Sequence, residues 1–249
     1  MSNDFIVVFG VIFIFAMTTL GSAVVFLFKK SVSDKLNSLF LGFASGLMIA
    51  SSIWSLLIPA LENGESLGTL KVLPVTGGIV LGCLFLVIMD KIIPFLLYKK
   101  RENRPKRLGK NATLFLAITL HNIPEGLAVG LAFGGAIIMA QTSAFYSALW
   151  LAVGIGIQNF PEGMAVSLSM KNRYEKKSRA FLFGSLSGIV EPIMALVGIW
   201  LSTSLSSLMP WFLSFAAGAM LFVVAEELLP DAKNTYPSKI VANEISKIL

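Results

Sequence analysis

Two copies of one motif lie in this chain, His121-Asn-Ile-Pro-Glu-Gly-Leu-Ala-Val129 and Gln158-Asn-Phe-Pro-Glu-Gly-Met-Ala-Val166, offset by 37 residues. Each copy places a carboxylate inside a long apolar segment, residues 112–139 and 143–170. Such a segment is long enough to cross a hydrocarbon core of about 30 Å as a helix. A charge there costs about 2.5–3.5 kcal/mol on insertion scales. The motif therefore predicts membrane helices whose carboxylates have a function.

The composition of the whole chain agrees with a bilayer as its solvent. Of 249 residues 55% are hydrophobic and 14% are charged, and the mean hydropathy is +0.79. A soluble protein of this length needs more polar surface. The net charge of +6 lies in short clusters between apolar segments, so we expect no nucleic-acid partner. A single cysteine, Cys83, excludes a disulfide framework or a thiolate metal cluster within one chain.

Seven apolar segments predict an all-α, polytopic transmembrane helical bundle that forms one transmembrane domain over residues 1–249. The predicted spans are 5–28, 36–59, 74–97, 112–139, 143–170, 180–203 and 209–229. Lysine and arginine cluster after the first, third and fifth spans. Because positively charged loops face the cytoplasm, we expect the N-terminus on the outer side of the cell membrane. The tail, residues 231–249, is then expected in the cytoplasm.

A second, fainter repeat relates the second and seventh spans. Phe43-Ala-Ser-Gly-Leu-Met48 matches Phe215-Ala-Ala-Gly-Ala-Met220, and Leu-Leu with a nearby proline follows each copy. The two spans are expected to cross the membrane in opposite directions. The pair therefore predicts an inverted repeat, as found in many secondary transporters.

Polar residues of the motif have the spacing of a metal site. His121 and Glu125 are four residues apart, as are Gln158 and Glu162, so each pair lies on one helix face. The nitrogen and oxygen donors suit Zn²⁺, Fe²⁺ or Mn²⁺, and the absence of thiolates keeps binding weak enough for release. The expected ligands are His121, Asn122, Glu125, Gln158, Asn159, Glu162 and a third buried carboxylate, Glu191.

The number of bound ions follows from the charge of the three carboxylates. Glu125, Glu162 and Glu191 together carry −3 when ionised, so one divalent ion leaves −1 and two leave +1. Both states are easier to hold in a low dielectric than the bare carboxylates. One bound ion and two bound ions are both consistent with the sequence.

The motif copies HNIPEG and QNFPEG resemble the signature of the ZIP family of zinc and iron transporters. Glutamine at position 158, where the first copy has His121, resembles the GufA-like bacterial branch of that family. The resemblance implies transport of Zn²⁺, or of Fe²⁺, Mn²⁺ or Cd²⁺, toward the cytosol. It implies one metal position at His121, Glu125, Gln158 and Glu162 with Met48, and a second at Asn122, Glu125, Asn159, Glu162 and Glu191. It also implies pathway residues, namely Ser55 on the outer side and Asp90, Glu226 and Glu227 near the cytoplasmic end.

The resemblance also sets expectations for the ends of the chain and for Met48. Family members have eight spans with both termini outside, so we expect this chain to lack the last span. Met48 is equally well explained as a core residue.

Rival functions are weaker. An intramembrane metalloenzyme needs an open metal position and a general base, usually in an HExxH motif, and the sequence contains one histidine and no such motif. We therefore expect no enzyme. A metal-gated channel differs from a carrier only in kinetics and stays an alternative. A second copy of the chain is a candidate partner, in a homodimer.

Overall fold

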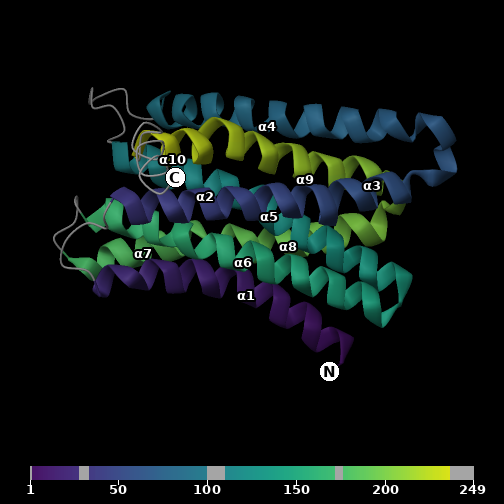
Figure 1. Cartoon of the computed structure of the whole chain (residues 1–249), viewed down its shortest axis with the longest axis horizontal. Helices are drawn as coiled ribbons and strands as arrows, with labels where there is room; N and C mark the ends of the chain where they lie inside the picture. The colour runs from purple at the N-terminus through teal and green to yellow at the C-terminus, as the bar shows by residue number, and fades with distance from the viewer. Residues whose placement is uncertain (1, 28–33, 100–109, 172–175, 236–249) are drawn as a thin grey trace, which may run out of the picture.

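The computed structural model describes residues 2–27, 34–99, 110–171 and 176–235, and all regular structure in these ranges is helical. Figure 1 shows the long helices side by side, with successive helices running in opposite directions along the longest axis. The predicted all-α bundle is confirmed. The basic loops 28–33, 100–109 and 172–175 and the tail 236–249, on which the predicted topology depends, lie outside the described residues.

The helices follow one another with short breaks. Their bounds are α1 (Asn3–Ala23), η1 (Val24–Phe26), α2 (Asp34–Ala50), η2 (Ser51–Leu57), α3 (Ile58–Asn63), η3 (Glu65–Lys71), α4 (Val72–Lys99), α5 (Lys110–Met139), α6 (Thr142–Lys171), α7 (Lys177–Ser187), α8 (Val190–Ser204), η4 (Ser206–Leu208), α9 (Met209–Val223), η5 (Val224–Leu228) and α10 (Leu229–Thr235).

Six helical stretches of the described chain are long and apolar enough to cross a membrane: Asn3–Phe26, Ser38–Asn63, Glu65–Ile92, Thr119–Met139, Lys177–Ser204 and Ser206–Lys233. The remaining predicted span, the fifth one at 143–170, corresponds to α6. That helix has 30 residues and a polar motif copy, like α5, and it is less apolar because Thr142, Ser143, Tyr146 and Ser147 add to its copy. The polar residues that indicate function thus also weaken the hydropathy signal.

The second span extends beyond its predicted end at residue 59. Pro59 lies in the first turn of α3, and the helix continues to Asn63. A proline inside a continuous helix removes one hydrogen bond, and the π-helical turn Ser51–Leu57 directly before α3 changes the hydrogen-bond pattern there without ending the helix. Proline therefore does not terminate this span.

Three pairs of helices make backbone contact: α1 with α6, α5 with α8, and α4 with α9. One glycine in each pair shows how close they are. A Cβ at Gly163, Gly126 or Gly82 would overlap the carbonyl oxygen of Thr18, Glu191 or Phe215, respectively. Small residues allow this approach in membrane proteins, where van der Waals contact drives helix association. The glycines therefore fix how each pair of helices sits.

The fainter repeat has a structural counterpart in two π-helical turns. Ser51–Leu57 follows its first copy and Val224–Leu228 follows its second. In Figure 1 α2 and α9 also run in opposite directions. The two passes thus share both the sequence pattern and the same irregularity, as an inverted repeat requires. Such turns are frequent at functional sites.

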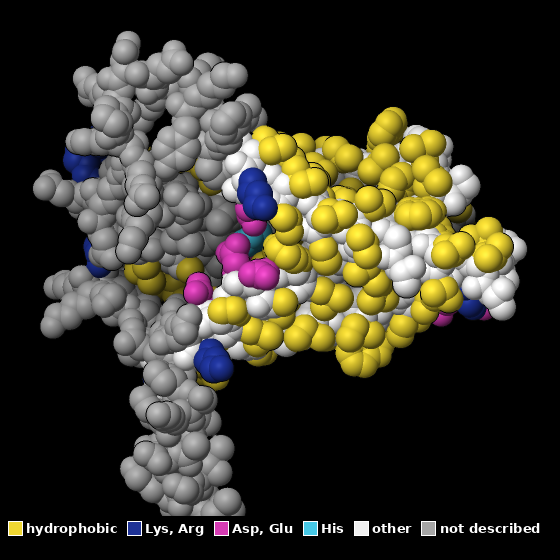
Figure 2. Space-filling model, turned by 90° about the horizontal axis from the view of Figure 1, so that it is seen from above, with side chains coloured by type: hydrophobic (Ala, Val, Ile, Leu, Met, Phe, Trp, Pro, Cys, Tyr) yellow, Lys and Arg dark blue, Asp and Glu magenta, His cyan; other side chains and the backbone are white. Residues whose placement is uncertain are grey.

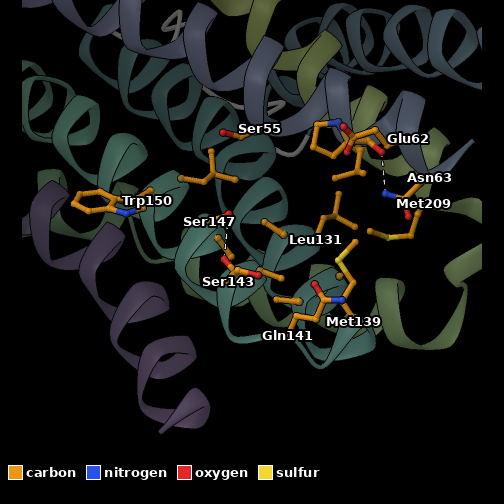
Figure 3. A pocket seen from close by; sticks show the side chains of 18 of the residues that line it. Ser55, Glu62, Asn63, Leu131, Met139, Gln141, Ser143, Ser147, Trp150 and Met209 are labelled. Atoms are coloured by element: carbon orange, nitrogen blue, oxygen red, sulfur yellow. Dashed lines mark hydrogen bonds between the residues drawn. The ribbon is translucent and has the colours of Figure 1, made fainter. Parts of the chain in front are cut away.

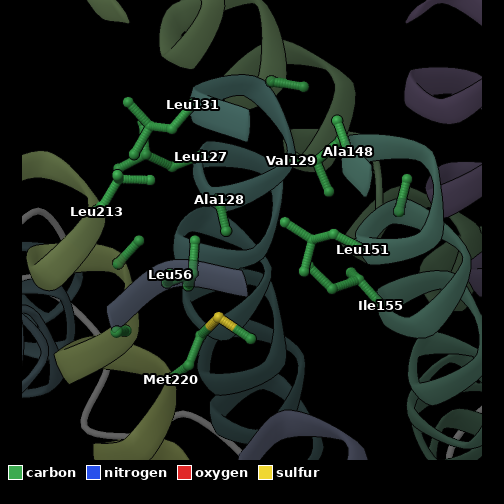
Figure 4. Packing of buried hydrophobic residues seen from close by; sticks show 14 of the residues in the cluster. Leu56, Leu127, Ala128, Val129, Leu131, Ala148, Leu151, Ile155, Leu213 and Met220 are labelled. Atoms are coloured by element: carbon green, nitrogen blue, oxygen red, sulfur yellow. The ribbon is translucent and has the colours of Figure 1, made fainter. Parts of the chain in front are cut away.

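An apolar cluster fills the middle of the bundle between η2, α5, α6 and α9 (Figure 4). We define it by its largest labelled side chains, Leu56, Leu127, Leu131, Leu151, Ile155, Leu213 and Met220. Met48 belongs to the same hydrophobic core and is fully buried. The cluster lies between the polar motif residues and a pocket.

Candidate metal site

The two motif copies lie on neighbouring antiparallel helices, α5 and α6, which pass through Pro124 and Pro161 without ending. The expected ligands of these helices are all buried. His121 and Glu162 are 6% exposed, and the other four, Asn122, Glu125, Gln158 and Asn159, are 0% exposed. Burial of so many polar groups inside a membrane bundle is costly unless each of them has a partner.

One hydrogen bond joins the two motif copies. Gln158 Nε2 donates to Glu125 Oε1 at 3.0 Å. Gln158 Oε1 and Glu125 Oε2 are buried without a hydrogen-bond partner. An unsatisfied buried polar group costs about 1–3 kcal/mol, and more when it is charged. The two oxygens are therefore placed to accept from a positively charged partner.

The same pattern occurs where α5 meets α8. Asn122 Nδ2 donates to Glu191 Oε1 and to the carbonyl oxygen of Ser187, both at 3.0 Å. An amide has two hydrogens, so the nitrogen of Asn122 is fully used. Asn122 Oδ1 and Glu191 Oε2 are buried without a partner. Glu191 lies in the first turn of α8, where the helix dipole stabilises a negative charge.

Asn159 and Glu162 complete the set. Both amide atoms of Asn159 and the Oε1 atom of Glu162 are buried without a hydrogen-bond partner, although the Asn159 amide lies near the carboxyls of Glu125 and Glu191. Glu125 also interacts electrostatically with Glu162 and Glu191. Six unpaired acceptor oxygens thus occur on α5, α6 and α8, from Asn122, Glu125, Gln158, Asn159, Glu162 and Glu191.

His121 lies close enough to Glu162 to act on its charge, but its direct contact is with a residue outside this set. Its Nε2 atom lies 3.0 Å from Glu227 Oε1, on η5. Among the residues that the structure describes, no group of three or more His, Cys, Asp and Glu side chains is arranged to hold an ion. The histidine is thus occupied by an acidic residue that the sequence analysis placed only on the exit pathway.

Acidic residues surround this contact at one end of the bundle. Glu227 is electrostatically close to Asp90 and Asp231, and Glu226 beside it is exposed. We name Asp90, Glu226, Glu227 and Asp231 the acidic patch. Figure 2 shows acidic side chains gathered beside the histidine, at the end of a broad apolar surface. His121 therefore lies between the buried oxygens and the acidic patch.

Comparisons with known proteins decide the family. A family model described as ZIP Zinc transporter matches residues 110–249. Zinc transporter ZIP11 of Homo sapiens is 32% identical, in an alignment that covers 97% of this chain and 93% of that protein. Zinc transporter GufA of Myxococcus xanthus is 39% identical over 86% of this chain and 84% of that protein. This chain belongs to the ZIP family.

Membership confirms the resemblance that the two motif copies carry. ZIP family proteins are transporters, so the expectation that the chain is not an enzyme is also confirmed. A third relative, zinc transporter ZIPB of Bordetella bronchiseptica, is 34% identical over 87% of this chain and 69% of that protein. Together with the apolar helices, the family shows a multi-pass membrane protein.

A pocket of about 700 Å³ lies at the end of the bundle opposite the acidic patch (Figure 3). We name it the end pocket. Its lining includes Ser55, which the ZIP resemblance implied for the pathway, together with Glu62 and Gln141. Leu131 belongs to both the end pocket and the apolar cluster. At 1.5 Å per residue it lies about 9 Å along α5 from Glu125, so the apolar cluster separates the pocket from the carboxylates.

A further contact of these buried carboxylates comes from a residue outside the motif. Thr18 Oγ1, on α1, donates to Glu191 Oε1 at 2.6 Å. Thr18 is a polar residue in an apolar span, but threonine commonly bonds to its own helix, and Ile14 O lies 3.3 Å from Thr18 Oγ1 as the longer, alternative acceptor of its one hydrogen. Nothing in the sequence separates these two uses of the hydroxyl group.

Proposed function

We propose that this ZIP family protein carries a divalent transition-metal ion, Zn²⁺ above all, across a cell membrane toward the cytosol. The observation that supports this function best is the set of six buried, unpaired acceptor oxygens on α5, α6 and α8. A neutral polar ligand would usually need hydrogen-bond donors from the protein as well, whereas a cation needs acceptor oxygens only. The relatives are named zinc transporters. Fe²⁺, Mn²⁺ and Cd²⁺ are alternative cargoes, since the same donors bind them.

The proposed ligands are the oxygens of Asn122, Glu125, Gln158, Asn159, Glu162 and Glu191, with His121 after it leaves Glu227. Glu125 and Glu162 come from the two motif copies and are close to each other, so each is suited to bridging two ions. With the three carboxylates ionised, two bound divalent ions would give the site a net charge of +1, and one ion would give −1. Met48, in the hydrophobic core, is a proposed soft ligand that would need to turn toward the ion.

The proposed path begins at the end pocket, beside Ser55, and ends at the acidic patch. In the structure the apolar cluster blocks the way from the pocket to Glu125, and a hydrated or bare divalent ion cannot cross such a layer. On the other side, Glu227 contacts His121 directly. This arrangement suits a state that receives no ion from the pocket and can release one past Glu227, Glu226 and Asp90.

Uptake of Zn²⁺ tests the proposed function. Cells that express the protein should accumulate Zn²⁺ from the medium faster than cells that carry an empty vector. Purified protein in vesicles with an enclosed zinc-sensitive dye should give the same result, because no other protein is then present. Equal rates with and without the protein would reject transport of Zn²⁺. Repeating the assay with Fe²⁺, Mn²⁺ and Cd²⁺ would rank the cargoes.

We also propose that the chain acts as one transmembrane domain with its N-terminus outside. Lys35, Lys176 and Lys177 flank the ends of helices at the same end of the bundle as the acidic patch, where positive charge favours the cytoplasm. Dimer formation, and a channel in place of a carrier, stay predictions from the sequence.

Thiol labelling checks this orientation. In a Cys83→Ser background, Asn63→Cys is expected to react with a membrane-impermeant maleimide added to intact cells. Lys176→Cys should react only after the cells are opened, because it lies at the other end of the bundle. The reverse pattern would invert the proposed direction of the path.

A further inference from the structure

Thr18 is held firmly in place, although it lies outside the motif helices. It is fully buried on α1. Its carbonyl oxygen lies against Gly163 and accepts from Ser22 Oγ at 2.9 Å, and the Gly163 carbonyl oxygen lies 3.2 Å from the same hydroxyl. A Cβ added at Gly188 would come within 2.8 Å of both Thr18 Cβ and Thr18 Cγ2. Contacts with the backbone of α6 and with the turn between α7 and α8 therefore fix the direction of the Thr18 side chain.

The hydroxyl of Thr18 acts on a single atom of the proposed site. It donates to Glu191 Oε1 at 2.6 Å, a length typical of a strong bond between a hydroxyl and a carboxylate. Asn122 Nδ2 donates to the same oxygen at 3.0 Å. Two donors use the lone pairs of Oε1, whereas Oε2 is buried and has no partner. The two oxygens of one carboxyl therefore have different surroundings.

We propose that Thr18 is a positioning residue of the metal site. Its hydroxyl, with the amide of Asn122, holds Glu191 Oε1 and so leaves Oε2 as the one atom that binds the cation. The first helix thereby takes part in metal binding without supplying a ligand. The inference rests on the proposed function, because it concerns how Glu191 is presented to the transported ion.

The alternative role of Thr18 is to join α1 to α8 without any effect on the ion. A purely structural bond would change the stability of the fold but not the affinity of the folded protein for metal. A positioning bond must change that affinity, because a carboxyl that is free to rotate loses the geometry that the ion needs. Affinity measured on folded protein therefore separates the two roles.

The experiment compares three variants of the whole chain. Thr18→Val keeps the shape of the side chain and removes the hydroxyl, whereas Thr18→Ser keeps the hydroxyl. Thr19→Val is the matched control, since the neighbouring Thr19 Oγ1 is buried without a hydrogen-bond partner. Calorimetric titration of purified protein with Zn²⁺ gives the affinity, and vesicle uptake gives KM and the maximum rate separately.

Thr18→Val should bind Zn²⁺ about tenfold more weakly, which is the usual effect of losing one hydrogen bond to a charged group. Its KM should rise by a similar factor while the maximum rate changes less. Thr18→Ser and Thr19→Val should both match the wild type. If Thr18→Val is not recovered folded, Thr18→Ala is compared with Thr18→Ser, since only the serine can donate.

Two results would overturn the proposal. Wild-type affinity in Thr18→Val would show that the hydroxyl has no part in metal binding, and the proposed transport function would stand unchanged. Equal losses in Thr18→Val and Thr18→Ser would show that packing rather than the hydroxyl matters. A wild-type protein that neither binds nor transports Zn²⁺ would instead remove the proposed function, and the role of Thr18 with it.

Discussion

Replacing Glu125 by glutamine is expected to reduce Zn²⁺ uptake to the level of protein-free vesicles and to leave the fold intact. Glutamine has nearly the same shape but no charge, and it brings an N–H group to a place where a cation needs acceptors. Glu125 Oε2 is one of the unpaired oxygens, and Glu125 lies beside Glu162 and Glu191. Its loss would weaken every proposed ion position, because Glu125 is one of the two carboxylates, with Glu162, that both positions share.

The fold should tolerate this change, because a neutral side chain is easier to bury than a carboxylate. Thermal unfolding of the purified protein in detergent would confirm it. Glu65→Gln is a matched control: Glu65 is an exposed carboxylate on η3, outside the end pocket and the proposed site, so the same loss of charge should leave uptake near the wild-type rate. Glu162→Gln and Glu125→Ala should abolish uptake as Glu125→Gln does. Near-normal uptake by Glu125→Gln or Glu162→Gln would reject the bridged site.

Replacing Gly126 by alanine should strongly destabilise the protein and abolish Zn²⁺ binding. A Cβ at this position would overlap the carbonyl oxygen of Glu191 and lie 2.8 Å from its Cα atom. Backbone of a packed helix cannot move aside as a flexible side chain can, so α5 and α8 must separate. Overpacking of this kind costs about 1–3 kcal/mol or more, which exceeds the gain of about 1 kcal/mol in helix propensity.

The separation of α5 and α8 would also break the bond from Asn122 to Glu191, which spans the same two helices. Gly154→Ala is the control, because no atom lies within 4 Å of a Cβ added there. It should leave stability unchanged or raise it by up to about 1 kcal/mol. Unfolding temperatures in detergent and calorimetric titration with Zn²⁺ measure both effects. If Gly126→Ala were as stable as Gly154→Ala, the close contact of α5 with α8 would be wrong.

The sequence alone was sufficient to predict the class of protein, its family and the candidate residues of the metal site. Apolar segments of spanning length follow from the thickness of the bilayer, and the four-residue spacing of His121 and Glu125 follows from the helical repeat. Both are local properties of the chain, so no contact between helices is needed to see them. Pro59 and α6 show the limits of local signals, since a proline did not end a span and a polar motif lowered the hydropathy of a long helix.

The tertiary structure decided which atoms meet. It placed His121 in direct contact with Glu227, and it brought Thr18 to Glu191 across 173 residues of sequence. These contacts depend on how far each helix is rotated and shifted against its neighbours. Close backbone contacts at glycines such as Gly126 and Gly163 set those positions. The chain has 21 glycines, and the sequence does not show which of them lie against another helix, so the positions of the donors to Glu191 could come only from the packed bundle.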